Sequence, residues 1–141
     1  MIHEDLNSQI IFSSRYANKV YLRCPNGFKN LSFNDILKFK NKFNRYLLNN
    51  KISEKDKVCT IIDNSKALIC LFLSIVGNNR IFVPINPSAG KKEIEYILKK
   101  TNPKLIITSD LMKSKIKNFK NYKIKFIINE ESFIDSIFKL E

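Results

Sequence analysis

The sequence predicts an α/β fold, with a mostly parallel sheet, helices on both faces and a short N-terminal β-hairpin in front of it. Two observations support this prediction. Four short apolar segments have the character of strands that are buried on both faces. Amphipathic segments alternate with them, and such alternation is typical of parallel sheets. We expect an N-terminal extension over residues 1–19 and a single α/β domain over residues 20–141.

The hairpin is expected near the N-terminus. Residues 20–22 and 28–31 are two short apolar stretches that flank Pro25-Asn26-Gly27. An Asn-Gly pair between two such stretches is a strong hairpin signal. We therefore expect the two stretches to pair as antiparallel strands.

A long amphipathic helix is expected to follow the hairpin. Ser32 and Asp35 fit a capping box, which satisfies free backbone N–H groups at a helix start. Apolar residues then recur at spacings of three and four, which places them on one helix face. These residues are Ile36, Phe39, Phe43 and Leu47, and Asn49-Asn50 is the expected end.

The rest of the chain alternates between strands and helices. Buried strands are expected at 58–62, 81–85, 105–107 and 124–128, and Pro84-Ile85-Asn86-Pro87 marks the end of the second one. Helices are expected at 65–76, at 88–100 and up to about residue 119, with Ser65 and then Ser109 or Thr108 as N-caps. Ser132 and Asp135 again have the form of a capping box and predict a last helix.

The net charge is +12, but a nucleic-acid partner is not the favoured interpretation. Of the 25 basic residues 21 are Lys, and Ile (21) and Asn (17) are also abundant, as A/T-rich codons would produce. Arg, the better residue for bidentate phosphate contacts, occurs four times. A lysine cluster near two aromatic residues keeps a nucleic-acid surface open, although a charged edge strand explains it as well. It comprises Lys113, Lys115, Lys117, Lys120, Lys123 and Lys125.

Several classes of protein are excluded by the cysteine, histidine and hydrophobic patterns. Cys24, Cys59 and Cys70 lack the spacing of zinc ligands and are expected to be buried, reduced thiols. His3 is the only histidine, so neither a metal site nor a histidine-assisted nucleophile is expected. Residues 67–76, the most hydrophobic run, have about half the length of a membrane span. With no signal peptide pattern either, we expect a soluble, cytoplasmic protein.

Parallel sheets bind ligands beyond the carboxyl ends of their strands, but no phosphate-binding motif is found there. A phosphate cradle needs several glycines, whereas Gly27, Gly77 and Gly90 are far apart. Residues 88–92 resemble only the tail of a P-loop, and the start of a helix explains them better. Acidic residues in the expected helices are interpreted as solvated or helix-dipole charges. They are Glu93, Glu95, Glu130 and Glu131.

Eight short motifs occur in a characteristic order. The most specific is Ile81-Phe82-Val83-Pro84-Ile85-Asn86-Pro87, which is similar to a-x-x-v-P-l-n-P. The others lie at 31–37, 43–48, 55–58, 61–65, in the helix that ends at Gly77, at 93–98 and at 103–108. Together they resemble the N-terminal segment of the adenylate-forming, or AMP-binding, superfamily of acyl-CoA synthetases and adenylation domains. The sequence departs from the pattern at Lys55, where the family has Gly, and at Asn78-Asn79-Arg80.

The resemblance implies the N-terminal subdomain of an acyl-CoA synthetase-like fold. For the complete family it implies ATP-dependent activation of a carboxylate to an acyl-adenylate, followed by thioester formation, with ATP, Mg and CoA. The family's phosphate loop, ribose-binding Asp and adenylation Lys have no counterpart here. We therefore expect no catalytic residue and no cofactor for this chain alone, and whether it is an enzyme stays open. Substrate-pocket candidates are the strand-end residues Asn64, Ser65, Asn86 and Pro87, which also fit structural roles as cap, turn formers and strand stop.

Three hypotheses remain open. The first is the N-terminal part of an adenylate-forming ligase, a scaffold wall beside an acyl or CoA pocket, with the rest of a synthetase or an acyl carrier as partner. The second is a stand-alone interaction or regulatory module that partners a complete or split synthetase. The third, which we place last, is a small basic nucleic-acid-binding domain.

Overall fold

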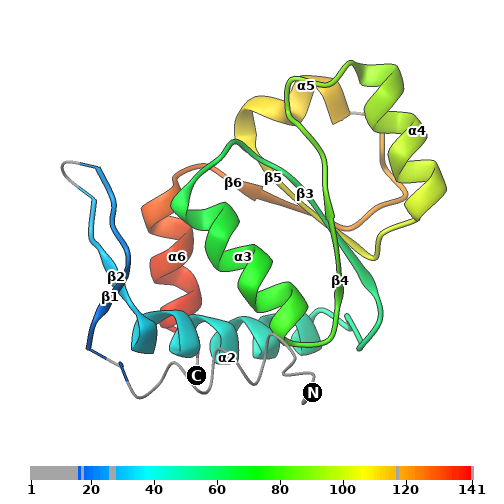
Figure 1. Ribbon diagram of the computed structural model, residues 1–141. Helices are drawn as coiled ribbons and strands as arrows, with labels where there is room; N and C mark the ends of the chain where they lie inside the picture. The colour runs from blue at the N-terminus through cyan, green and yellow to red at the C-terminus, as the bar shows by residue number, and fades with distance from the viewer. Residues whose placement is uncertain (1–15, 17, 26–27, 117, 141) are drawn as a thin grey trace, which may run out of the picture.

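The computed structural model describes residues 16, 18–25, 28–116 and 118–140. Within these residues a two-stranded antiparallel hairpin precedes a four-stranded parallel sheet with helices on both faces (Figure 1). The predicted fold class is therefore confirmed. Most of the expected N-terminal extension lies outside the described residues.

The hairpin consists of β1 (Val20–Leu22) and β2 (Leu31–Ser32), which pair antiparallel as predicted. The second strand begins later than the expected residue 28. Just before β2, Cys24 N–H donates a hydrogen bond of 2.8 Å to the side-chain oxygen of Asn30 and not to a backbone carbonyl group, so the backbone ladder does not extend this far. The expected turn at Asn26-Gly27 lies outside the described residues.

Helix α2 (Phe33–Asn49) starts at the predicted capping box. Ser32 Oγ accepts a hydrogen bond of 3.1 Å from Asp35 N–H, and Ser32 N–H donates to Asp35 Oδ2 at 2.9 Å. Burial opposes ionisation of Asp35, but these hydrogen bonds and two nearby lysines outweigh it, so that its pKa is lowered. The apolar stripe faces inward as predicted, because Ile36, Phe39, Phe43 and Leu47 are all buried.

The parallel sheet has the strand order β4-β3-β5-β6. Its strands are β3 (Lys57–Ile61), β4 (Ile81–Pro84), β5 (Leu105–Ser109) and β6 (Ile124–Ile127). All four expected strands are present, with small shifts at their ends. β3 and β5 are central, whereas β4 and β6 are the edges. Because every pair is parallel, the carboxyl ends of all four strands meet at the same end of the sheet.

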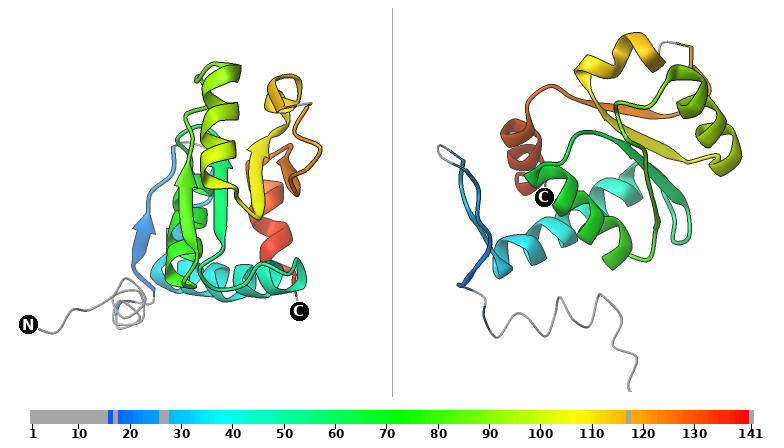
Figure 2. Two further views of the ribbon diagram at one scale, coloured as in Figure 1. Left: turned by 90° about the vertical axis from the view of Figure 1, so that its right-hand side faces the viewer. Right: turned by 45° about the horizontal axis from the view of Figure 1, so that its top comes forward.

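Helices cover both faces of the sheet, as Figures 1 and 2 show. α2, α3 and α6 lie on one face, and α4 and α5 lie on the other. Among the residues described, no helix is long and apolar enough to cross a lipid bilayer. The remaining helices, with the 3-10 turn η2 before α5, are α3 (Lys66–Gly77), α4 (Lys91–Thr101), η2 (Asp110–Met112), α5 (Lys113–Ile116) and α6 (Glu130–Phe138).

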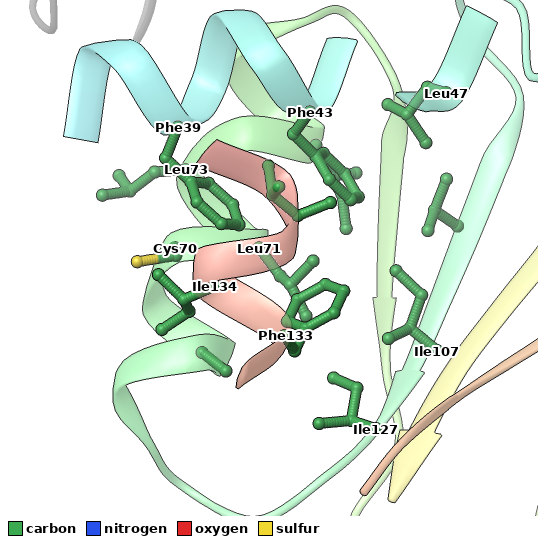
Figure 3. Close-up of a cluster of buried hydrophobic side chains, with 14 of the residues drawn as sticks. Phe39, Phe43, Leu47, Cys70, Leu71, Leu73, Ile107, Ile127, Phe133 and Ile134 are labelled. Atoms are coloured by element: carbon green, nitrogen blue, oxygen red, sulfur yellow. The ribbon is translucent and has the colours of Figure 1, made fainter. Parts of the chain in front are cut away.

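Two separate hydrophobic cores lie on the two faces of the sheet. Leu105 and Ile107 of β5 belong to the core under α2, α3 and α6, whereas Ile106 belongs to the core under α4 and α5. This alternation is the two-residue period of a β-strand. In the larger core, Phe39 of α2 meets Phe133 of α6 with ring centres 6.4 Å apart (Figure 3). The apolar residues whose spacing predicted the strands and helices are thus the residues that pack in these two cores.

Two helix starts differ from the expected ones. α4 begins after Gly90 instead of at Ser88, because Ser88 N–H is taken up by the side chain of Asn86 in a turn. α6 begins after Asn129, so the predicted capping box at Ser132 is wrong. Asn129 Oδ1 accepts a hydrogen bond of 2.9 Å from Ser132 N–H and is itself the N-cap.

The helix after β5 is shorter than expected. It ends at Ile116 instead of near residue 119, and its first turn is the 3-10 turn η2. Neither predicted cap makes a capping bond here. Ser109 has no side-chain cap hydrogen bond, and Thr108 Oγ1 donates across the sheet to Ile61 O at 2.8 Å. The Thr108 hydroxyl, which the sequence pattern predicts to be a helix cap, therefore forms a tertiary hydrogen bond instead.

All three cysteines are free, as predicted. Cys59 of β3 and Cys70 of α3 are fully buried, one in each core, but Cys24 is only half-buried. Burial raises the pKa of the Cys59 and Cys70 thiols to about 12. Neither group is therefore a thiolate nucleophile at neutral pH.

We expect the free energy of unfolding to fall as the pH rises above 9. The unfolded chain ionises its thiols near pH 9, whereas the folded chain keeps Cys59 and Cys70 protonated up to about pH 12. The folded state then holds more protons, and each thiol lowers the free energy of unfolding by about 1.4 kcal/mol per pH unit. Urea denaturation across this pH range measures the slope. Cys59→Ala and Cys70→Ala should each make it shallower, and a slope that neither substitution changes would contradict the prediction.

Candidate functional site at the carboxyl ends of the strands

The loops that follow β3 and β4 leave the sheet side by side. The two strands are parallel neighbours, with Thr60 opposite Pro84. Ile85 N–H continues the ladder by donating to Thr60 O at 2.8 Å. One loop then leads into α3 and the other toward α4. This is the position at which parallel sheets bind ligands.

A hollow of about 260 Å³ lies between these two loops and the start of α3. It contains three of the four residues predicted to line a substrate pocket, Asn64, Asn86 and Pro87. The structure therefore brings these three together, and their role in substrate binding stays a prediction. The other lining residues are Thr60, Ile62, Asp63, Leu68, Pro84 and Ile85.

Two of the predicted site residues also have clear structural roles. Ser65, the fourth, does not line this hollow, and its hydroxyl accepts a hydrogen bond of 3.2 Å from Leu68 N–H as the N-cap of α3. Asn86 Oδ1 accepts a hydrogen bond of 2.9 Å from Ser88 N–H and forms the turn before α4. The predicted helix cap and turn former are thus confirmed.

Thr60 is a polar residue of the hollow that the sequence analysis missed. It is 1% exposed, and its hydroxyl has no hydrogen-bond partner within the described part of the chain. Buried hydroxyl groups normally have a partner, so Thr60 is a candidate for a hydrogen bond to a bound molecule. The sequence does contain a signal, because this is the one hydroxyl group inside the otherwise apolar run of β3.

A second hollow, of about 400 Å³, lies between the hairpin and the start of α3. Asn64 lines both hollows, and Ser65 lines only this one. Polar residues on its wall include Lys66 and Glu130. The walls are otherwise mainly apolar and come from Leu22, Pro25, Phe28 and Ile69.

The charged groups at the start of α3 are paired within the chain. Lys66 is buried, forms an ion pair with Glu131 and donates to Lys29 O at 3.1 Å. Glu130 Oε1 accepts a hydrogen bond of 2.6 Å from Ala67 N–H. The predicted helix-dipole role is therefore confirmed for Glu130, while Glu131 serves as the ion-pair partner. The N-terminus of α3 already has a carboxylate from α6 in place.

The segment that resembles a P-loop tail forms the start of α4. Gly90 has a φ of −66° and serves as the N-cap. A Cβ atom at this position would meet no heavy atom within 4 Å, so neither strain nor close packing requires glycine. Nowhere in the described ranges do three or more His, Cys, Asp or Glu side chains gather as they would around a metal ion. His3 lies outside those ranges.

Much of the lysine cluster around α5 and β6 is engaged in contacts within the chain. Lys115 Nζ donates to Pro87 O at 2.8 Å, and Lys123 Nζ donates to Asn50 O, just after α2, at 2.8 Å. Lys113 forms an ion pair within its own turn. Lys117 lies outside the described residues. β6 is an edge strand, as the structural interpretation of the cluster requires.

The parallel sheet, with helices on both faces and a hollow beyond its strand ends, defines an α/β domain. A family model described as AMP-binding enzyme matches residues 12–136. The chain therefore belongs to the family of AMP-binding enzymes, as the order of its motifs predicted.

Curated relatives and a solved structure agree with this family. The chain is 26% identical over 87 residues to D-alanine--D-alanyl carrier protein ligase of Listeria monocytogenes serotype 4a (strain HCC23), a match of 61% of this chain and 17% of the relative. It is 34% identical over 58 residues to acyl-CoA ligase ppsA of Aspergillus oryzae (strain ATCC 42149 / RIB 40), which covers 41% of this chain and 10% of the relative. The structure of the Brucella canis acyl-CoA synthetase matches 87% of this chain and 23% of its own, with a TM-score of 0.76 at 21% identity.

These matches fix the family and the fold. The chain spans less than a fifth of the length of the two curated relatives. At 21% identity the Brucella canis structure shows an acyl-CoA synthetase-like fold and nothing further about this chain. The adenylate-forming ligase class is therefore established at the level of the family.

Proposed function

We propose that the chain is the N-terminal part of an adenylate-forming ligase and that the 260 Å³ hollow forms part of the wall of its acyl or CoA pocket. In that reaction a carboxylate attacks ATP, pyrophosphate leaves, and a thiol then takes the acyl group from the adenylate as AMP leaves. Family membership supports the reaction class. The convergence of Asn64, Asn86 and Pro87 beyond the ends of two parallel strands supports the position of the site.

We infer that the 141-residue chain does not catalyse this reaction by itself. Stabilising the charge on ATP phosphates takes several N–H groups and cations that converge on one point. No two of the three glycines share a loop. At the N-terminus of α3 the Glu130 carboxylate already accepts the Ala67 N–H, and it would repel a phosphate. ATP, Mg and CoA are thus ligands of the complete ligase, which we place in the cytoplasm with an acyl carrier or CoA as the acyl acceptor.

The DNA that encodes the chain provides the first test. We expect the reading frame to continue after the codon for Glu141 into a loop rich in Gly, Ser and Thr that carries a Lys. The product of the complete frame should exchange pyrophosphate with ATP only when a carboxylate is present, and the 141-residue chain should show no exchange. A stop codon directly after Glu141 would refute the proposed function, and exchange by the short chain alone would refute its inactivity.

A substitution tests the wall of the pocket in the product of the complete frame. Asn64→Ala should raise the KM for the carboxylate or the thiol by about tenfold, the effect of one lost hydrogen bond, and leave the KM for ATP unchanged. Asn41→Ala is the matched control, because Asn41 is exposed on α2 and lies outside both hollows. Equal KM values for the two variants would show that Asn64 does not contribute to the pocket.

An interaction module is the second candidate function. Its support is that both cores are built from residues of this chain, so the domain has what it needs to fold separately. Such a module would bind a complete or a split synthetase, and a stop codon directly after Glu141 would favour it. Nucleic-acid binding stays the third hypothesis, and its test is retention on DNA at physiological salt with a steep salt dependence.

A further inference from the structure

Helix α3 is apolar on all of its faces. It has no charged residue after Lys66, although 27% of the residues in the chain are charged. Its inner face packs in the larger core, yet Ile69 and Phe72 on its outer face are 38% and 41% exposed. Helices that are apolar all round are normally buried. The outer face of α3 therefore has the composition of an interior surface.

Neighbouring elements extend this apolar area. Phe28 of the hairpin loop is 49% exposed and lines the 400 Å³ hollow together with Ile69. Phe82 of β4 contacts Phe72, with ring centres 5.2 Å apart. The hairpin, α3 and β4 all lie toward the viewer in Figure 1, and the two views of Figure 2 agree with this. We call Phe28, Ile69, Phe72 and Phe82 the α3 surface.

The helix on the opposite face of the sheet is built differently. Most outward residues of α4 are charged, with Tyr96 as the exposed aromatic exception, and Glu95 and Lys99 form an exposed ion pair of 3.1 Å. The edge strand β6 contains Lys125, whereas β4, the other edge strand, contains no charged residue although both of its ends are exposed. Edge strands that face water usually carry charge. The absence of charge from the outer face of α3 and from β4 thus indicates a side of the domain that is covered in the complete protein.

We propose that the remaining part of the adenylate-forming ligase packs on the α3 surface, an inference that rests on the proposed function. The Brucella canis acyl-CoA synthetase matches this chain over 23% of its own length, so most of such a fold must lie elsewhere. A second copy is a poor occupant, because two chains of net charge +12 would repel each other. The occupant therefore has an apolar centre and an acidic group that would face Arg23 on the wall of the hollow, where Lys66 and Glu130 already have partners within the chain.

Hydrogen exchange in two proteins tests this surface. The amides of residues 66–77 are followed in the 141-residue chain and in the product of the complete reading frame. Packing on α3 should slow their exchange about tenfold or more in the longer protein, and the amides of residues 91–101 on the opposite face serve as the internal reference. The double variant Ile69→Glu/Phe72→Glu should return the exchange of α3 to the rate in the short chain. Ile69→Ser/Phe72→Ser is the milder pair if the glutamates prevent folding.

A control variant and the possible outcomes distinguish failure of the α3 surface proposal from failure of the proposed function. Leu111→Glu changes an 89% exposed apolar residue of η2, which packs on the face of the sheet opposite α3, and should leave the exchange of residues 66–77 unchanged. Equal exchange of α3 in the two wild-type proteins would overturn the inference and leave the proposed function intact. So would dimerisation of the short chain that Ile69→Glu abolishes, because a second copy would then be the occupant. A stop codon directly after Glu141 would overturn the proposed function and this inference together.

Discussion

Replacing Phe39 with alanine is expected to lower the free energy of unfolding by about 3–5 kcal/mol. Phe39 is fully buried in the larger core, and its ring centre lies 5.9 Å from that of Phe43 and 5.8 Å from that of Phe138. Removing the ring would leave a cavity between α2 and α6 (Figure 3). A loss of this size is a large part of the stability of a small domain. Urea denaturation measures it as a lower midpoint at an unchanged slope.

Tyr96→Ala is the matched control for this substitution. Tyr96 is also an aromatic residue of a helix, but it is 62% exposed. Its replacement should change the free energy of unfolding by less than about 1 kcal/mol, as is usual for surface positions. If Phe39→Ala were no more destabilising than Tyr96→Ala, the packing of α6 on α2 would not be the core of this domain.

The second large effect is expected at Arg80, where alanine should lower the free energy of unfolding by about 3 kcal/mol. Arg80 is 5% exposed, and its guanidinium donates to Asn44 Oδ1 at 2.8 Å and to Ile52 O at 2.9 Å. A third hydrogen bond goes to Asn78 O. The substitution leaves the buried Ile52 O and the two part-buried acceptors without this donor, and chemical denaturation measures the loss.

Two further variants at the same position separate charge from hydrogen bonding. Arg80→Lys keeps the charge, but a single ammonium group cannot reach three separate acceptors, so we expect a loss between those of wild type and Arg80→Ala. Arg80→Met keeps most of the apolar stem without any donor. If the methionine variant were as stable as the wild type, the three hydrogen bonds would contribute nothing net.

The position of Arg80 also explains a departure from the family pattern. Asn78-Asn79-Arg80 stands where small, apolar residues are expected. Asn78 Nδ2 donates to Lys40 O at 2.9 Å, and Asn79 has a φ of 60°, in the left-handed region that Asn tolerates. The three residues join the end of α3 to α2 and the start of β4. Polar residues are accommodated here because every one of them has a local structural role.

Local patterns were sufficient to predict most of the elements. The capping box at Ser32 and the apolar spacing after it identify α2 almost to the residue, because both signals depend only on neighbours in the chain. The same rule fails at Ser132, where the side chain of Asn129 competes for the same backbone N–H and wins. It fails again at Thr108, whose hydroxyl bonds across the sheet.

The candidate site could be predicted only in part. Asn64, Asn86 and Pro87 are identifiable because residues after parallel strands meet at the same end of a sheet. The sequence marks Thr60 only as the one hydroxyl group in β3, and its lack of a hydrogen-bond partner becomes apparent only when its surroundings are known. Lys66 is missed for a similar reason, because its partner Glu131 lies on a helix far along the chain.

By itself, the sequence determined the α/β class, the family and the faces of the helices, because apolar periods and capping residues act over a few neighbouring positions. The tertiary structure alone decided the strand order β4-β3-β5-β6. It also decided which buried polar groups are paired and which helix face stays uncovered. Those properties depend on contacts between residues distant in sequence. The apolar composition of α3 is visible in the sequence, but its exposed outer side appears only once the sheet is assembled.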